Sequence, residues 1–162
     1  MIVVIDGTDL SGSNLSGKDF SHRYFDGFNF EGANLIGAKL KGANLIGANL
    51  KYAELSGADL RGADLSGSDC EGANFSCANL RGAKLNGARL LNADFFSANL
   101  VCADLTCADL TGAHLGDTDL LLASFDGANL IGVYLVGARL DGVDFSGFDI
   151  GIKGYRLVRE DA

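Results

Sequence analysis

The sequence predicts an all-β solenoid built from short repeated coils, and three regularities of the residue pattern support this. Every fifth position from Leu10 to Ile150 is apolar, most often Leu and otherwise Phe, Cys or Ile. The residue two positions before each of these centres is usually Ala, and the residue two positions after it is usually Gly. Nothing interrupts this register. We therefore expect one repeat domain over residues 1–150, with residues 151–162 as a C-terminal capping tail.

A period of five residues requires a bend in every repeat. Side chains of a β-strand alternate between two faces, so a straight strand would point successive centres in opposite directions. All centres can face one interior only if a short extended stretch is followed by a corner. Gly suits such a corner, because a type II turn needs a residue with positive φ. We expect Ala and the centre to point inward, and the residue between them and the two corner residues to point outward.

Other periodic structures fit the spacing less well. In the interior of an α-helix each Gly costs about 1 kcal/mol relative to Ala, and here Gly recurs at intervals of five residues. Left-handed hexapeptide helices need a period of six, and leucine-rich repeats space their leucines unevenly within a longer unit.

Many repeats read Ala-(Asp/Asn)-Leu, among them Ala33-Asn34-Leu35, Ala58-Asp59-Leu60, Ala78-Asn79-Leu80, Ala103-Asp104-Leu105 and Ala128-Asn129-Leu130. Over residues 6–150 the sequence resembles the pentapeptide-repeat family, whose repeat is Ala-(Asp/Asn)-Leu-x-x. The resemblance implies a right-handed quadrilateral parallel β-helix with four repeats in each coil. Residues 20 apart would then stack about 4.8 Å apart, which gives about seven coils of 20 residues and a rod about 35 Å long.

Composition and charge argue against several classes of protein. A net charge of −8 argues against binding to nucleic acid, because phosphates are bound by clustered Lys and Arg. The apolar N-terminal residues lack a basic region before them and stop at Asp6, so we expect neither a signal peptide nor a membrane span, and a cytoplasmic protein. No nucleophile elbow, phosphate loop or spaced set of metal ligands is present. We expect no enzymatic activity, no cofactor and no metal site.

The two ends of the repeat depart from its pattern. At the small inward position, Lys18, Arg23 and Phe28 replace Ala near the start, and Phe148 does so near the finish. We expect residues 1–30 to form irregular N-terminal coils that act as a cap, with Lys18 and Arg23 turned outward. Phe28 and Phe148 fall in one column and are expected to plug the ends of the interior. A homodimer joined through one end is an alternative use of the same residues.

The cysteines and His114 are weak candidates for chemistry. Cys70 replaces Leu at a centre and is expected in the core. Cys77, Cys102 and Cys107 are expected to face outward on three different corners, too far apart for disulfides, so all four should be free thiols. His114 falls between Asp94 and Tyr134 in one outward column, where a solvent-facing ladder is the better interpretation than an acid–base site.

Residues 91–136 are the strongest candidate for a binding surface. Nearly all of the net negative charge comes from residues 90–150, which contain nine carboxylates and a single basic residue, Arg139. Most corners without Gly lie between residues 77 and 122. Apolar side chains rimmed by polar groups often mark interaction sites. The leading hypothesis is a non-enzymatic scaffold that binds another protein through Leu91, Phe96, Val101, Leu121, Leu122, Ile131 and Val136, with Asp104, Asp109 and Asp119.

The alternative function comes from the resemblance. Some pentapeptide-repeat proteins resemble duplex DNA in width and charge and inhibit or protect DNA gyrase. The nine carboxylates would span about 14 Å of rod, over which duplex DNA carries about eight phosphates. The chain departs from that subgroup, however, because it has no loop inserted between repeats. Its 12-residue tail is also short for a dimer-forming C-terminal helix.

Overall fold

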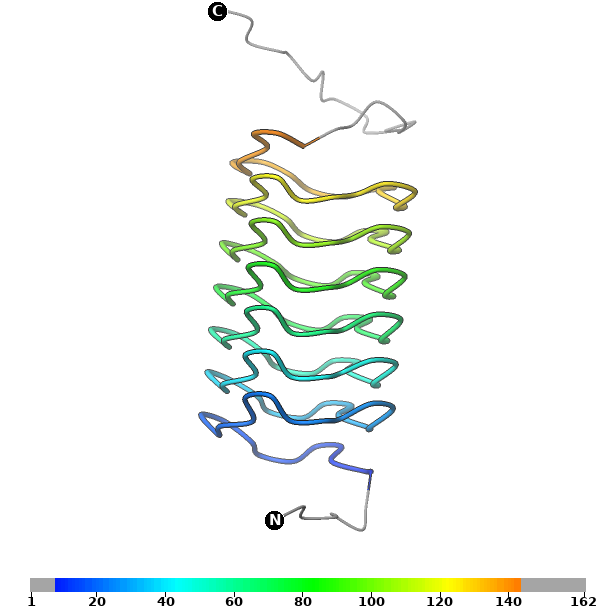
Figure 1. Ribbon diagram of the computed structural model, residues 1–162. Coiled ribbons are helices and arrows are strands. Elements are labelled where there is room, and N and C mark those ends of the chain that lie inside the picture. Colours follow the sequence, from blue (N-terminus) through cyan, green and yellow to red (C-terminus); the bar gives the residue numbers. More distant parts are fainter. Residues whose placement is uncertain (1–7, 144–162) are drawn as a thin grey trace, which may run out of the picture.

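A computed structural model of the chain describes residues 8–143. Their backbone winds into a column of similar coils stacked along one axis, with the first coil at one end and the last described coil at the other (Figure 1). Residues 1–7 and 144–162 lie outside the described part. The coil number of the whole chain, the plug at Phe148 and the capping tail at 151–162 therefore stay predictions.

Adjacent coils are joined in a constant register of 20 residues. Parallel bridges pair each outward residue with the one 20 positions later, from Asp9↔Asn29 to Asp119↔Arg139. Each five-residue repeat ends in a turn closed by a backbone hydrogen bond, as where Ala63 N donates to Leu60 O at 3.0 Å. Four such turns divide every coil of 20 residues. The predicted stacking and the four-sided cross-section are confirmed over the described residues.

The β-structure consists of isolated bridges alone. Between residues 8 and 143 there is no helix, and no strand is longer than one bridged residue. The reason is the short repeat: the turn uses the centre, both corner residues and the following Ala, which leaves one residue to form the bridge. Within this part of the chain no helix is long and apolar enough to cross a bilayer.

Hydrogen bonds between coils satisfy the backbone at three positions of each repeat. Around Leu60, for example, Leu60 N donates to Asn79 O at 2.8 Å and Gly62 N donates to Arg81 O at 3.0 Å. The third bond runs to the preceding coil, from Asp59 N to Ala38 O at 2.9 Å. Since buried backbone groups must be paired, this ladder lets a chain without long strands enclose an apolar interior.

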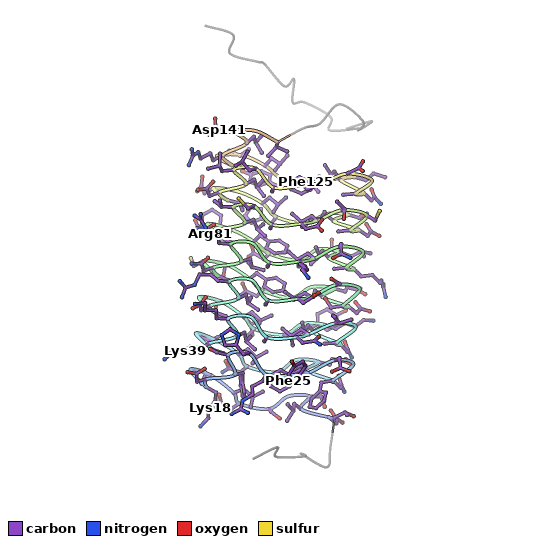
Figure 2. The ribbon with its side chains drawn as sticks, viewed as in Figure 1. Lys18, Phe25, Lys39, Arg81, Phe125 and Asp141 are labelled. Atoms are coloured by element: carbon purple, nitrogen blue, oxygen red, sulfur yellow. The ribbon has the colours of Figure 1, made fainter. Side chains whose placement is uncertain are left out.

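The interior is filled by stacked centres alternating with small residues (Figure 2). From Phe30 to Leu120 every centre and every Ala at the inward position is buried, as predicted. Phe75 and Phe95 stack with their ring centroids 4.9 Å apart. Two polar residues, Ser68 and Thr118, take the place of Ala. Ser68 Oγ lies 3.2 Å from Cys70 Sγ, and Thr118 Oγ1 donates to Phe95 O at 2.9 Å.

The corners keep one backbone conformation whether or not they contain Gly. Second-corner glycines between Gly12 and Gly142 have φ between 61° and 78°. The nine residues that replace Gly at this position have φ between 53° and 59°: His22, Tyr52, Cys77, Asn92, Ser97, Cys102, Cys107, Asp117 and Leu122. Loss of Gly between residues 77 and 122 therefore changes the sequence and not the shape of the corner. The hydrogen-bond ladder on both sides holds each of these coils in place.

The first coils contain an aromatic cluster. Phe25 makes edge-to-face contacts with Phe20, Phe28 and Phe30, each at a centroid separation of 5.4 Å. Phe28 is half-buried and packs against the core. Lys18 and Arg23 are exposed, as predicted for side chains turned away from the interior.

Candidate functional site

The outward residue before each centre has a structural role that the sequence pattern did not reveal. Every Asp or Asn at this position in the described residues accepts a hydrogen bond at Oδ1 from the backbone N–H two residues later, at the first corner position. Asp and Asn favour turns because their short side chains bond to nearby backbone in this way. The Asp/Asn of the repeat is therefore explained by the corner that follows it.

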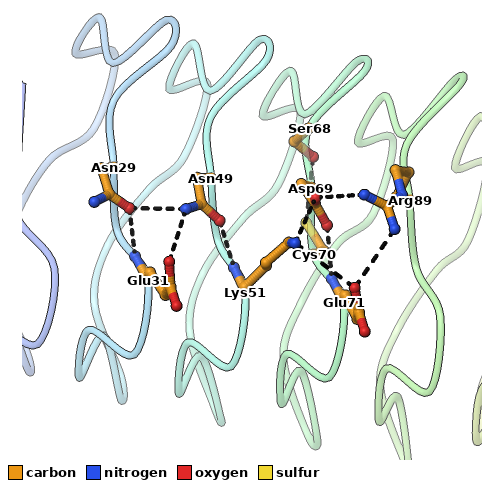
Figure 3. Close-up of polar contacts among 9 residues, drawn as sticks. All are labelled: Asn29, Glu31, Asn49, Lys51, Ser68, Asp69, Cys70, Glu71 and Arg89. Carbon is orange, nitrogen blue, oxygen red and sulfur yellow. Dashed lines mark hydrogen bonds and ion pairs between the residues drawn. The ribbon is translucent and has the colours of Figure 1, made fainter.

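These side chains also connect neighbouring coils. Figure 3 shows one such column, in which Asn49 Nδ2 donates to Asn29 Oδ1 at 2.9 Å. Further along this column, Asp69 forms ion pairs with Lys51 of the preceding coil at 3.3 Å and with Arg89 of the next coil at 2.8 Å. Exposed ion pairs of this kind each contribute about 0–1 kcal/mol. The column is best understood as a stabilising ladder.

The three predicted carboxylates belong to this structural set. Asp104 accepts a hydrogen bond from Thr106 N at 3.0 Å, and Asp109 accepts one from Thr111 N at 3.1 Å. Asp119 accepts one from Leu121 N at 3.1 Å and forms an ion pair with Arg139 at 3.6 Å. All three are half-buried. Asp104 and Asp109 each use Oδ1 for the corner, which leaves Oδ2 for contact with a partner, whereas Asp119 uses both oxygens within the fold.

The predicted apolar residues differ widely in exposure. Phe96, Leu122, Ile131 and Val136 are exposed by 41%, 59%, 62% and 43%, whereas Leu91 and Leu121 are half-buried. Val101 is only 5% exposed, so its prediction as a contact residue is wrong. It is buried without belonging to the main core cluster. Its column neighbours, Arg81 and Leu121, lie one coil away on either side, and side chains at that spacing cover a short Val.

Four of these residues flank a single side of the rod. Leu91 and Phe96 occupy the two corners that flank Asp94, and Ile131 and Val136 occupy the same corners two coils later, where they flank Tyr134. We call the outward residues of segments 91–96, 111–116 and 131–136 the aromatic face. Leu121 and Leu122 lie on a different corner and do not belong to it.

Three stacked rings form the centre of the aromatic face. The His114 ring lies 5.6 Å from the Phe96 ring at an interplanar angle of 14°, and 4.8 Å from the Tyr134 ring at 23°. Gly116 makes room for them, since a Cβ there would lie 3.2 Å from both His114 Nε2 and a Tyr134 ring carbon. The sequence placed His114 and Tyr134 in one column. Their stacking with Phe96, from the neighbouring column, was missed.

Asp94 holds this cluster in place. Its Oδ1 accepts a hydrogen bond from Phe96 N at 2.9 Å and lies 3.1 Å from His114 Nδ1. One carboxylate therefore fixes both the corner that carries Phe96 and the orientation of the His114 ring. Such a pair resembles part of an acid–base site, but the arrangement orders aromatic side chains on an outer surface.

The thiols and potential metal ligands suggest no further chemistry. All four cysteines are free, as predicted, with Cys70 buried and Cys77, Cys102 and Cys107 exposed. Burial raises the pKa of the Cys70 thiol to about 12, so this core thiol stays protonated at neutral pH. Among residues 8–143, no group of three or more His, Cys, Asp or Glu side chains could hold a metal ion.

The chain belongs to the pentapeptide-repeat family, whose family model, "Pentapeptide repeats (8 copies)", matches residues 19–51, 29–67, 73–112 and 108–147. Proteins of this family are generally non-enzymatic structural or binding proteins. The family's fold implies that the coils described above form a right-handed quadrilateral β-helix. The resemblance inferred from the Ala-(Asp/Asn)-Leu repeats is thereby confirmed.

Two solved structures illustrate the likeness. HetL, a pentapeptide repeat protein involved in heterocyst differentiation regulation from the cyanobacterium Nostoc sp. strain PCC 7120, is 28% identical with a TM-score of 0.52, over 83% of this chain and 75% of HetL. QnrB1, a plasmid-mediated fluoroquinolone resistance protein, in an R167E, trypsin-treated form, is 23% identical with a TM-score of 0.60, over 86% of this chain and 84% of that one. No curated protein matched the chain.

Proposed function

We propose that this protein is a non-enzymatic scaffold that binds another protein through the aromatic face. The observation that supports the proposal is the cluster of Phe96, His114 and Tyr134, with exposed Ile131 and Val136 beside it. Aromatic residues are enriched at protein interfaces, and apolar clusters on an otherwise polar surface often mark them. This assignment narrows the predicted surface to one side of the rod and adds His114 and Tyr134 to it.

The same side of the rod is polar in the coil immediately before the aromatic face. Segment 71–76, one coil before Leu91, presents Glu71, Asn74 and Ser76 at the corresponding outward positions. Those residues bond to one another or to neighbouring coils, as where Ser76 Oγ donates to Asn74 Oδ1 at 2.6 Å. The change from polar to aromatic residues is therefore local. The ladder of backbone bonds is the same in both parts, so the fold does not require this change.

A stacked and hydrogen-bonded cluster suits binding because it is ordered beforehand. Immobilising a flexible side chain at an interface costs about 0.5–1.5 kcal/mol. Stacking reduces that cost for His114 and Tyr134, and the hydrogen bond between His114 and Asp94 reduces it further for His114. A partner with an apolar or aromatic strip would cover the rings, while Asp94 keeps the His114 ring hydrogen-bonded.

The proposal also covers the cell compartment and the kind of role. Three exposed free thiols suit the cytoplasm, where thiols stay reduced. HetL, at 28% identity, is involved in regulation of a differentiation process. For this chain we propose regulation by binding in the same general sense, through a partner and a process of its own.

Affinity capture with a matched pair of variants tests the proposal. Phe96→Asp places a charge in the centre of the aromatic face. Ile36→Asp makes the same change in the same column three coils earlier, at a site of similar exposure, 45% against 41%. We expect wild type and Ile36→Asp to recover the same partner from the source cell, and Phe96→Asp to lose at least nine-tenths of it, which corresponds to about 1.4 kcal/mol. Equal recovery by all three proteins would exclude the aromatic face.

A DNA-mimicking gyrase modulator is less well supported. Asp94, Asp104, Asp109 and Asp119 lie in four different columns, one on each side of the rod, and do not form two rows like the phosphates of a duplex. One oxygen of each also bonds to backbone. The likeness to QnrB1, at 23% identity, extends to the fold alone.

A further inference from the structure

One corner of the rod carries charges of opposite sign at its two ends. The third corner of each coil, here called the third-corner ridge, consists of residues 21–22, 41–42, 61–62, 81–82, 101–102, 121–122 and 141–142. Its first residues read, in order along the rod, Ser21, Lys41, Arg61, Arg81, Val101, Leu121 and Asp141. In Figure 2 Arg81 and Asp141 are labelled along the same edge of the rod. The ridge therefore runs from basic through apolar to acidic.

The cations of this ridge are unusual in their pairing. Elsewhere on the rod a cation generally pairs with a carboxylate one coil away, as Lys84 does with Asp64 at 3.2 Å. Among the described residues, four cations form no ion pair: Lys18 and Arg23 in the first coil, and Lys41 and Arg81 on the ridge. Like charges stacked on neighbouring strands are destabilising. Arg61 is paired with Asp59 and Lys41 also attracts Asp59, but Arg81 has no such partner, so an external anion is its natural complement.

The middle of the ridge is apolar at its surface. Leu122 is 59% exposed, Leu121 is half-buried, and Cys102 beside them is exposed. Val101, which lies between Arg81 and Leu121 in this column, is buried. Protein interfaces commonly have an apolar centre with charged groups toward the rim. On the ridge Arg81 lies on one side of that centre and Asp141 on the other, each one coil away from it.

We propose that two copies of this chain pair side by side and antiparallel along the third-corner ridge. A twofold axis between the coils of Val101 and Leu121 places each apolar centre on the other, because residue 101 then lies opposite residue 121 of the second copy. The same axis places Arg81 of each copy opposite Asp141 of its mate. A parallel pair would instead place cation on cation. The occupant is therefore a second copy, whose charge order complements the first only in the antiparallel sense.

The contact is expected to be weak. Four coils span only about 20 Å of rod, less than the length over which a standard interface of about 1,600 Å² extends. Asp141 also forms an ion pair with Arg139 of its own chain at 2.6 Å. The dimer should consequently depend on concentration and on salt, and not be permanent. The third-corner ridge is separate from the aromatic face. An experiment can therefore disprove one of the two proposed surfaces without disproving the other.

A charge-exchange experiment tests the pairing. Molar mass is measured by light scattering over a concentration series at an ionic strength of about 0.01 M, where the Debye length is about 30 Å. We expect wild type to dimerise, and Arg81→Asp and Asp141→Arg to shift each dimerisation constant at least tenfold toward monomer. Arg81→Asp with Asp141→Arg in one chain restores opposite charges across the axis and should restore the dimer. Added salt at about 1 M should weaken the wild-type dimer.

Lys41→Asp is the matched control. Lys41 lies in the same column as Arg81 and also forms no ion pair, but it lies two coils beyond the overlap. This variant changes net charge as Arg81→Asp does, and it should leave the dimer essentially intact. Thermal unfolding verifies that each variant folds. A wild type that is monomeric at low salt overturns the proposal. So does a dimer that Arg81→Asp leaves unchanged, as a dimer joined through one end of the rod would be.

Discussion

At the scale of single residues, the most informative positions are the outward Asp and Asn and the second corner residue. The first accepts a backbone hydrogen bond that holds the following corner. The second adopts positive φ even where it carries a side chain, as at Ser97 with φ of 55°. Both are features of a turn repeated many times, so small energies at one position recur along the whole rod.

Asp64 should make stability depend on pH. Burial alone would raise the pKa of Asp64, but hydrogen bonds from Ser66 and Lys84 outweigh it and hold the pKa below its ordinary value of 3.8. A lowered folded-state pKa contributes stability that is present above 3.8 and lost as pH falls through the folded pKa. Asp64→Asn keeps an oxygen for Ser66 N but removes the charge.

We expect this variant to unfold at a lower temperature than wild type at neutral pH. The difference should shrink as the pH falls below 3.8 and through the lower folded-state pKa of Asp64, where the carboxylate of the folded wild type becomes protonated. Thermal unfolding across a pH series measures both. A difference that is constant with pH would show that the charge of Asp64 contributes no stability.

Ser97 tests the strain of a corner without Gly. A non-Gly residue in the left-handed region costs about 1–2 kcal/mol, while Gly loses about 0.5–1 kcal/mol more chain entropy on folding. Ser97→Gly should therefore stabilise the protein by about 0.5–1 kcal/mol. Ser97→Ala keeps the strain and should leave stability nearly unchanged. Comparison of their unfolding temperatures decides, and a lower value for Ser97→Gly than for Ser97→Ala would contradict this account.

At the scale of the structural element, the unit is the coil and not a strand. A single coil cannot bury its centres, and it gains its backbone partners from the coils above and below it. Interior coils such as that of Leu60 are covered on both sides, and this side chain is fully buried. Leu140, in the same column, belongs to the last described coil and is half-buried.

Because Leu60 and Leu140 lie in the same column, the effect of one substitution, Leu→Ala, can be compared between an interior coil and the last described coil. Leu60→Ala removes a fully buried side chain and should lower the free energy of unfolding by about 2–5 kcal/mol. Leu140→Ala removes a partly exposed one and should lower it by less. Denaturant unfolding of both variants measures the two losses. Equal losses would mean that the last described coil is covered as completely as the interior.

At the scale of the whole molecule, the rod separates folding from recognition. Interior ladders and backbone bonds are the same from coil to coil, while the outward residues vary freely. A repeat protein of this kind can therefore carry an aromatic cluster on one side and a charged ridge on another without a change of fold. The proposed partner surface and the proposed self-association surface occupy separate columns for this reason.

Much of the fold was predictable because the repeat has no interruption. The inward Ala and Leu followed from spacing, and the 20-residue register followed from the family resemblance. The outward Lys18 and Arg23 were predicted because charged side chains are rarely buried without a partner. The candidate surface was predicted less well. Burial of Val101 depends on the length of neighbouring side chains in its column. The stacking of His114 on Phe96 depends on how two adjacent columns meet across a corner, which a one-dimensional period does not contain.

By itself the sequence determined the period, the identity of the inward residues and membership of the pentapeptide-repeat family, since each is a property of spacing that recurs many times. Only the tertiary structure decided which outward residues meet. It joined Phe96, His114 and Tyr134 into one cluster, buried Val101, and kept the corners at positive φ where Gly is absent. The physical reason is that outward contacts form between residues about 20 apart in the chain, where side-chain length and rotamer, and not periodicity, control the distance.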